Sequence, residues 1–497
     1  MRLLVALLLC AAITLPAIGQ DSPRNERQLR RALDRLVADT SLVNATIGVS
    51  VVDLATGRTL YAHNANKTLM PASNTKLYTT AAALDQLGAD FRWSTPVYAD
   101  GIVEHGVLKG NLVVVGSGDP SIGRQFQDCD IVEVFRGWAD AVKAAGIRTV
   151  DGHLIGDDNA FDDLQLGYGW SWDDEPWYYS AEISALSFND NTVDITVEPT
   201  VPGGPGTVTW EPSMTDYMDV WNATVTVPDS MRLREGYERD RQGNRLVIST
   251  RVPVGYTEEE AISVHNPTRY FLHVLRETLI AEGIAVTGGI HDIDDIPSLP
   301  AVSGTQPIAR HTSVPLSDVV EVINKDSNNL YAELVLKTLG AQLPDSTSDA
   351  DPGSAAMGWA AGMRTLAAAR VDTARIRLAD GSGLSRMNFV SPEMSTALLQ
   401  YMASHPDSTV RSVWYDSLPI AGVDGTLEYR MRGTSAEGNV RAKTGTLTGA
   451  SALSGYVTTS RGTPLAFSLM MNLYHGSSRD ARRIQDLISE TLARYRR

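Results

Sequence analysis

The sequence predicts an α+β fold in which an antiparallel sheet is flanked by two terminal helices, with an all-helical part beside it and a large mostly-β insertion. Residues 26–39 and 477–495 each place apolar side chains at the spacing of one helix face. Apolar, β-branched runs typical of strands lie near both ends of the chain, at 46–54, 59–62, 441–446, 450–459 and 464–472. Residues 91–299 instead carry short β-like runs separated by Gly, Pro, Asn and Asp.

The remaining elements fit around this framework. Residues 74–87 have strong helix character and follow a loop at 69–73. Residues 318–323 and 330–339 predict further helices, which belong to the all-helical part. In the middle region, apolar spacing over 268–282, just behind a proline, predicts one helix. The β-like runs of that region are 112–115, 193–197, 207–210, 223–227 and 245–251.

The length of the chain predicts more than one domain. At 497 residues it exceeds what a single hydrophobic core usually serves. We expect a catalytic domain in two parts, residues 20–95 and 300–497. Between them, residues 96–299 form the inserted mostly-β region, which we interpret as two nested modules.

Residues 1–19 predict a cleavable secretory signal peptide. A single arginine precedes an apolar run at 3–15, and small residues at 17 and 19 come before a polar segment. The apolar run is short for a bilayer span, and a retained anchor is the alternative. We therefore expect export across the inner membrane, to a periplasmic or extracytoplasmic location.

Composition and charge exclude several classes of partner. The formal net charge of −16 argues against nucleic acid and against anionic lipid, which both reward clustered Lys and Arg. No histidine falls in a zinc-like spacing such as H-E-x-x-H, and no glycine-rich phosphate-binding loop is present. Acidic groups at 157–158, 162–163 and 173–175 fit surface carboxylates better than a calcium loop. We expect no metal and no cofactor.

Ser73-Asn74-Thr75-Lys76 is the first candidate catalytic segment. A serine at the start of a helix and a lysine three residues later lie on one helix face, one turn apart. A serine nucleophile needs a nearby base, and a buried lysine with a lowered pKa can serve as one. About two S-x-x-K matches are expected by chance in a chain this long. A helix cap followed by a surface lysine is therefore the alternative for this segment taken alone.

Ser327-Asn328-Asn329 is the second candidate segment, and it lies between two predicted helices. A buried hydroxyl here can pass a proton to a leaving amine, and an asparagine amide can orient the substrate and the lysine. A second Ser-x-Asn match, Ser187-Phe188-Asn189, leads into a β-like run of the middle region, so we prefer the later one. The alternative is a polar turn between helices.

Lys443-Thr444-Gly445 is the third candidate segment, at the start of a predicted strand that continues through Thr446. The lysine offers a cation to a substrate carboxylate, and the threonine offers a hydroxyl. The glycine leaves room for the close approach of a backbone or a ligand. The strand edge supplies N–H and C=O groups for an extended peptide. Chance matches to K-T-G number only about 0.1 in a chain of this length.

The order S-x-x-K, S-x-N, K-T-G is the signature of penicillin-binding proteins and serine β-lactamases. The chain resembles the class C low-molecular-mass penicillin-binding proteins, the D-alanyl-D-alanine carboxypeptidase/endopeptidase family. It is similar to them in the long insertion between the first two motifs and in residues 116–120, 185–191 and 380–386. The resemblance implies a penicillin-binding/serine β-lactamase-like transpeptidase domain for the predicted sheet and helices.

The resemblance also implies a function. It indicates a serine DD-peptidase that cleaves D-Ala-D-Ala, or D-Ala-containing cross-links, in peptidoglycan stem peptides through an acyl-enzyme, and that β-lactam antibiotics acylate. Ser73 would be the nucleophile and Lys76 its base, while Ser327 and Asn329 would assist proton transfer and placement. The backbone N–H groups of Ser73 and Thr446 would form the oxyanion hole. The residues that the resemblance assigns to substrate binding are Lys443, Thr444, Gly445 and Thr446.

Two other functions remain open from the sequence. One is a β-lactamase or esterase on the same site, distinguished by fast deacylation. The other is a non-catalytic cell-wall-binding protein, which the intact motifs disfavour because binding alone requires neither the serine nor both lysines. Asn328, where class A β-lactamases carry Asp, suits the peptidase group better. Residues 380–386 either border the site or form a glycine-rich turn, and the aromatic residues at 168–179 either stack on sugars or pack internally.

Overall fold

The structure is a computed structural model that describes residues 22–127, 130–213, 215–296 and 306–497. The predicted signal peptide, 1–19, lies outside these residues. Within the described part of the chain, no helix is both long enough and apolar enough to cross a bilayer. Helices and sheets mix as the sequence predicts for an α+β fold.

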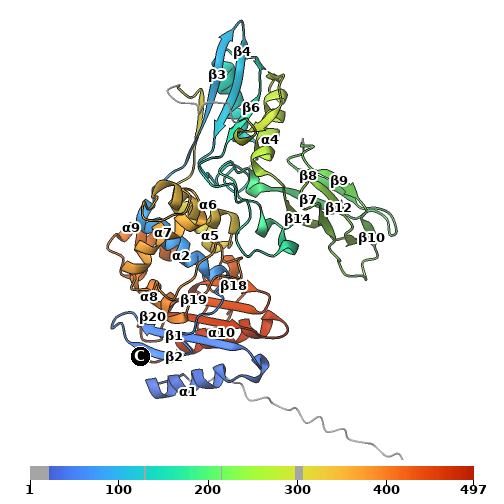
Figure 1. The fold of residues 1–497 in the computed structure, drawn as a ribbon. Helices are drawn as coiled ribbons and strands as arrows, with labels where there is room; N and C mark the ends of the chain where they lie inside the picture. Colours follow the sequence, from blue (N-terminus) through green and yellow to red (C-terminus); the bar gives the residue numbers. More distant parts are fainter. Residues whose placement is uncertain (1–21, 128–129, 214, 297–305) are drawn as a thin grey trace, which may run out of the picture.

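An antiparallel sheet with strand order β18-β19-β20-β1-β2 forms one end of the molecule (Figure 1). Helices α1 and α10 pack on one face of this sheet, and α8 packs on the other. The predicted ends of these strands and terminal helices agree with the structure to within two residues. The elements are α1 (Glu26–Val37), β1 (Thr46–Asp53), β2 (Thr59–His63), α8 (Pro392–Ala403), β18 (Arg441–Leu447), β19 (Ala450–Thr458), β20 (Pro464–Asn472) and α10 (Ser478–Ala493).

The helical part lies between this sheet and the inserted region (Figure 1). Helix α2 runs through its middle and is buried from Thr75 to Leu84, because the surrounding helices cover it on several sides. A buried core of apolar side chains joins these helices to one face of the sheet. The elements are α2 (Thr75–Leu87), α5 (Leu316–Lys325), α6 (Asn329–Gln342), α7 (Ala355–Ala368) and α9 (Ser408–Asp416).

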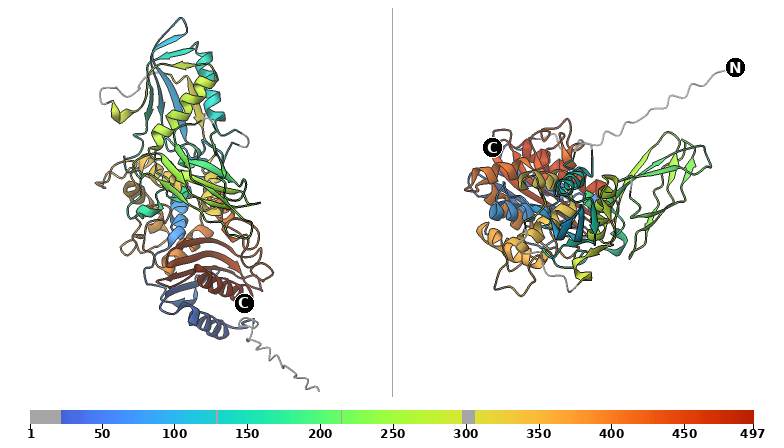
Figure 2. Two further views of the ribbon diagram at one scale, coloured as in Figure 1. Left: turned by 90° about the vertical axis from the view of Figure 1, so that its right-hand side faces the viewer. Right: turned by 90° about the horizontal axis from the view of Figure 1, so that it is seen from above.

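The inserted region contains a mixed sheet covered by two helices. Smaller sheets, whose strands come between β6 and β15 in the chain, project sideways from it (Figure 2, right). The larger sheet has the strand order β15-β5-β4-β3-β17, with β6 and β16 paired beside it. Its elements are β3 (Ser94–Glu104), β4 (Val107–Val115), α3 (Glu133–Ala144), β5 (Thr149–Asp151), β6 (Leu154–Asp157), α4 (Pro267–Ala281), β15 (Ala285–Val286), β16 (Ile290–Asp292) and β17 (Ala309–Thr312). The smaller sheets contain β7 (Thr192–Glu198), β8 (Thr207–Glu211), β9 (Asp219–Asn222), β10 (Val225–Val227), β11 (Tyr237–Arg239), β12 (Arg245–Ile248), β13 (Arg251–Pro253) and β14 (Glu258–Ser263).

The helix predicted at 268–282 is present as α4, and the inserted region also contains α3, which was not predicted. Phe135, Trp138, Ala139 and Val142 form its buried face, at helical spacing. The predicted run 245–251 is also divided between β12 and β13. The division at 96 and 299 stays a prediction. Strand β17, which follows the second of these positions, still pairs with β3.

Candidate active site

Ser73 lies in a single 3₁₀ turn, Ala72–Asn74, that leads directly into α2. Ala72 has a φ of 48°, a left-handed conformation that is strained for a residue with a Cβ and typical of functional sites. The Asn74 side chain donates to the Lys443 carbonyl oxygen at 2.9 Å, which ties this turn to β18. The first and third motifs are therefore joined by a hydrogen bond immediately behind the serine.

Lys76 is fully buried in the first turn of α2, and three oxygen atoms surround its Nζ. It lies 3.1 Å from Ser73 Oγ, 2.5 Å from Asn329 Oδ1 and 2.8 Å from the Ser382 carbonyl oxygen. A neutral amine has two N–H donors and one lone pair. The amide and carbonyl oxygens can accept both N–H groups, so the lone pair is free to face the Ser73 hydroxyl.

Burial also lowers the pKa of Lys76, to about 7, because the ammonium form loses its hydration. The negative charges of Asp380 and Glu333 act in the opposite direction and keep the pKa from falling further. A lysine with this pKa is largely neutral just above pH 7. It therefore has the protonation state that a general base requires.

The second motif forms the turn between α5 and α6. Ser327 has a φ of 66°, and its Oγ accepts a hydrogen bond from Lys443 Nζ at 2.8 Å. Asn329 uses both ends of its amide: Oδ1 accepts from Lys76, and Nδ2 donates to the Tyr179 carbonyl oxygen at 2.6 Å. Ser187, from the second Ser-x-Asn match, instead hydrogen-bonds within the inserted region. The turn thus brings the second motif into contact with both lysines.

The third motif occupies β18, at the edge of the sheet. Burial and the nearby Lys76 hold the pKa of Lys443 well below its usual range, while Asp326 opposes them. Thr444 Oγ1 donates to Thr426 Oγ1 at 2.8 Å. Thr444 and Thr446 line the open space beside the strand. A substrate carboxylate placed there would favour the protonated form of Lys443.

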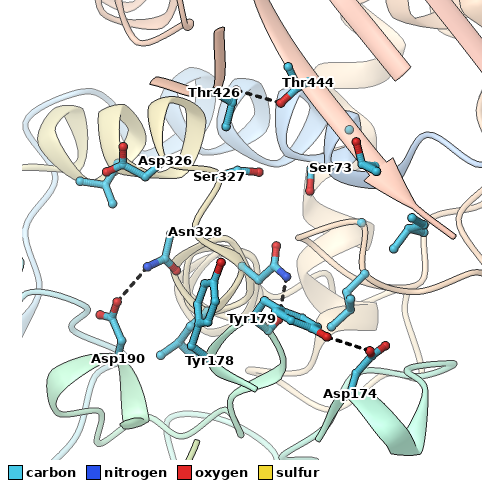
Figure 3. Close-up of a pocket in the computed structure, with 18 of the residues that line it drawn as sticks. Ser73, Asp174, Tyr178, Tyr179, Asp190, Asp326, Ser327, Asn328, Thr426 and Thr444 are labelled. Atoms are coloured by element: carbon cyan, nitrogen blue, oxygen red, sulfur yellow. Dashed lines mark hydrogen bonds between the residues drawn. The ribbon is translucent and has the colours of Figure 1, made fainter. Parts of the chain in front are cut away.

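The three motifs open onto one cavity of about 760 Å³ (Figure 3). Ser73, Ser327, Asn329, Thr444, Gly445 and Thr446 line it, while the two lysines lie in the wall behind them. The loop at 380–386 borders this cavity through Gly383, Leu384 and Arg386. The structure therefore brings together all the site residues that the sequence predicts. Two groups of three side chains could ligate a metal: Asp216, His273 and Glu277, and Asp158, Asp292 and Asp294. None of these six residues lines the cavity.

Comparison with known proteins assigns the chain to a family. Its sequence matches the D-Ala-D-Ala carboxypeptidase 3 (S13) family over residues 29–495. The chain belongs to this family. It is 36% identical to a D-alanyl-D-alanine carboxypeptidase of Actinomadura sp. (strain R39), over 97% of this chain and 87% of that protein. It is 27% identical to the D-alanyl-D-alanine carboxypeptidase DacB of Haemophilus influenzae, over 86% of each.

A solved structure shares the fold of this S13 family member. The crystal structure of penicillin binding protein 4 (dacB) from Haemophilus influenzae superposes with a TM-score of 0.79 at 24% identity. The match covers 93% of this chain and 99% of that one. The predicted penicillin-binding fold is therefore confirmed.

Several residues that line this cavity were not predicted from the sequence. Asp174, Tyr178, Tyr179 and Asp190 reach the cavity from the inserted region (Figure 3). The sequence offered weak signals for them: the aromatic cluster at 168–179, the acidic group at 173–175 and the segment 185–191 that resembles the family. None of these patterns indicates a position in space.

Two buried carboxylates, Glu333 and Asp380, act on Lys76; Asp380 belongs to the segment 380–386 noted in the sequence, whereas Glu333 was missed. Glu333 accepts hydrogen bonds from the backbone N–H groups of Gly381 and Ser382, at 2.7–3.0 Å. Asp380 accepts from the N–H groups of Gly383 and Ser385 in the same loop. Burial and the neighbouring Asp380 raise the pKa of Glu333 to about 7. These bonds hold the loop so that the Ser382 carbonyl faces Lys76.

Gly445 is expected to be essential because the turn that carries Ser73 packs against it. A Cβ at this position would lie 2.6 Å from the Pro71 carbonyl oxygen and 3.0 Å from the Ser73 nitrogen, closer than atoms tolerate. We expect Gly445→Ala to displace the turn and slow acylation by a fluorescent penicillin roughly 100-fold. Gly137, exposed on α3 with open space around it, provides the control. Gly137→Ala should acylate normally and gain about 0.5–1 kcal/mol of stability. Equal acylation rates in the two variants would contradict this reading.

Proposed function

We propose that this S13 family member is a serine DD-peptidase in which Ser73 attacks the carbonyl carbon between the two D-alanines of a peptidoglycan stem peptide. The peptidase activity follows from membership of the family. We further propose an assignment of roles to the individual residues of the site. It rests mainly on one observation, the placement of Lys76 Nζ between Ser73 Oγ and two acceptors that use its N–H groups.

Acylation then proceeds in two proton transfers. As Ser73 Oγ bonds to the carbonyl carbon, its proton moves to the lone pair of Lys76. The backbone N–H groups of Ser73 and Thr446 are suited to stabilise the oxyanion that develops. When the C–N bond breaks, Ser327, which Lys443 contacts, relays the proton of the Lys76 ammonium to the leaving D-alanine amine: the Ser327 hydroxyl gives its proton to the amine and regains one from Lys76, which becomes neutral again. Asn329 holds Lys76 in place throughout.

Residues of β18 would bind the substrate. Thr444 and Thr446 line the cavity and the buried Lys443 lies behind them, so these three residues of β18 would hold the terminal carboxylate. Gly445 lets the strand approach the turn that carries Ser73. Water afterwards hydrolyses the acyl-enzyme and releases the shortened peptide. A β-lactam imitates the substrate, opens on Ser73 and leaves a long-lived adduct. Peptidoglycan stem peptides and β-lactams are thus the proposed ligands, with neither nucleic acid nor a cofactor involved.

The acylation rate should depend on pH through Lys76. Its pKa of about 7 means that a falling pH protonates the amine and removes the base. We expect the second-order rate constant for penicillin acylation to fall about 10-fold per pH unit below about pH 6.5 and to level off above about pH 8. Stopped-flow fluorescence, with circular dichroism confirming the folded state at each pH, measures this profile. A rate that decreases from pH 6 to 8 would rule out the proposed role of Lys76.

The activity itself is tested with a peptide that ends in D-Ala-D-Ala and with benzylpenicillin. We expect release of free D-alanine from the peptide. With benzylpenicillin, the intact mass should increase by that of one penicillin, and the adduct should persist much longer than one catalytic turnover. Rapid hydrolysis of the antibiotic without an adduct would identify a β-lactamase. No adduct, intact antibiotic and no D-alanine would identify a non-catalytic binding protein. Cross-linked muropeptides, offered in parallel, separate carboxypeptidase from endopeptidase action.

We also propose that the protein is exported and acts in a periplasmic or other extracytoplasmic compartment, where peptidoglycan lies. The signal pattern at 1–19 supports this localisation. The mass of the protein recovered from outside the cytoplasm tests it: loss of about 19 residues is expected. A full-length protein confined to the cytoplasm would refute it.

A further inference from the structure

Asp190 reaches the cavity from a turn of the inserted region whose backbone is strained. Asn189, Asp190 and Asn191 have φ values of 47°, 55° and 54°, so three consecutive residues with side chains adopt the left-handed conformation. Such strain persists only where surrounding contacts hold it. Asn191 supplies some of these contacts, since its Oδ1 accepts from the Phe188 N–H and its Nδ2 donates to the Glu182 carbonyl.

The strained turn directs Asp190 toward the second motif. Asn328 Nδ2 donates to Asp190 Oδ2 at 3.1 Å (Figure 3). The Tyr331 phenol also acts on this carboxylate through a hydrogen bond. Burial raises the pKa of Asp190 to about 6, and the hydrogen bonds from Tyr331 and Asn328 limit the rise. The carboxylate is therefore mostly ionised at neutral pH.

The orientation of the Asn328 amide follows from its second contact. Its Oδ1 accepts from the backbone N–H of Tyr331 at 3.0 Å and caps the first turn of α6. A backbone N–H can only donate, so the oxygen must point to the helix and the NH₂ group to Asp190. An aspartate at 328 could cap the helix equally well, but it would place a second carboxylate against Asp190. The pairing explains why this motif reads Ser-Asn-Asn.

We propose that Asp190 is a positioning residue for the peptidase reaction: through Asn328 it holds the turn that carries Ser327 and Asn329. Ser327 has a left-handed φ of 66°, and it must meet Lys443 while Asn329 meets Lys76. The Asn328 side chain caps the helix on one side of the turn and is anchored to the inserted region on the other. The inserted region thereby sets the geometry of the catalytic groups, in addition to bordering the cavity.

An exchange of the two side chains tests this proposal, which rests on the proposed function. Asp190→Ala should lower the acylation rate constant at saturating fluorescent penicillin about 10- to 100-fold, with little change in the dissociation constant. Asn328→Asp opposes two carboxylates and should lower it similarly. The double variant Asp190→Asn/Asn328→Asp restores one donor facing one acceptor, and should return to within about threefold of wild type. Asp240→Ala, on an exposed turn of the inserted region, serves as the control.

The pH dependence of Asn328→Asp sharpens the test. At acid pH the two facing carboxylates can share one proton and regain a hydrogen bond. The rate of this variant, divided by that of wild type at the same pH, should therefore rise as the pH falls from about 8 to about 5.5. Other charged groups near the pair include Asp194 on β7, which acts on Asp190 and pairs with Arg124 at 3.1 Å. Asp119 and Asp326 act on Tyr331.

Each outcome decides between a positioning role and a purely structural one. Active-site titration counts the competent molecules, so fewer active sites with an unchanged rate per site would overturn the proposal. An exchange variant no faster than Asn328→Asp would also overturn it. If Asp190→Ala does not fold, the comparison between Asn328→Asp and the exchange variant carries the test alone. Failure of wild type to acylate would instead refute the proposed function.

Discussion

Replacing Ser73 with alanine should abolish covalent labelling by fluorescent penicillin and slow D-alanine release by roughly 10³-fold or more. The Oγ is the atom proposed to form the acyl-enzyme, and no other group replaces it in the covalent step. The side chain contributes little to packing, because it lines the open cavity and its Oγ contacts Lys76. The variant should therefore fold normally and still bind penicillin without reacting.

The control for this variant is Ser412→Ala, on the exposed face of α9. It should label at the wild-type rate. Intact mass spectrometry and the melting temperature are measured for both proteins. Stoichiometric labelling of the Ser73→Ala protein would place the nucleophile elsewhere.

Replacing Lys76 with methionine should slow acylation by about 10²- to 10⁴-fold, the usual contribution of a general base. The methionine keeps the length and the apolar stem of the buried side chain but has no lone pair for the Ser73 proton. Lys76→Arg distinguishes proton transfer from charge, since a guanidinium keeps its proton in proteins. Arginine should therefore be as inactive as methionine. Rapid acylation by Lys76→Arg would show that a positive charge, and not a base, is needed.

Lys67→Met is the control for the loss of a lysine, because Lys67 is exposed and lies shortly before Ser73 in the chain. It should acylate at the wild-type rate. The pH profile of the residual activity in Lys76→Met adds a second check. The inflection near pH 7 should disappear with the amine that causes it.

The sequence predicted the five-stranded antiparallel sheet, the terminal helices and the three candidate segments because their signals are local. Continuous apolar, β-branched runs and helical apolar spacing depend on neighbours a few residues apart. The Ser73-to-Lys76 spacing likewise places both side chains on one helix face before any tertiary contact exists. Helix α3 was missed, although Phe135 and Trp138 carry a helical pattern, because short β-like runs dominate the surrounding sequence.

Other features depend on contacts between residues far apart in the chain. Asn328 and Asp190 are separated by 138 positions, and Asn329 and Tyr179 by 150. No periodicity connects such pairs, and the Asn-Asp-Asn at 189–191 matches an ordinary turn as well as it matches a cavity wall. The role of Glu333 is hidden for the same reason. Its partners are backbone N–H groups, which every sequence contains.

The sequence by itself therefore determined which chemical groups are available, two serines, two lysines and an asparagine in motifs with a known order. The tertiary structure decided their reactivity. Packing around α2 removes water from Lys76 and lowers its pKa to about 7, while the turn after α5 presents Asn329 to its Nζ. Desolvation depends on every chain segment that covers a side chain, and so it becomes defined only when the fold is complete.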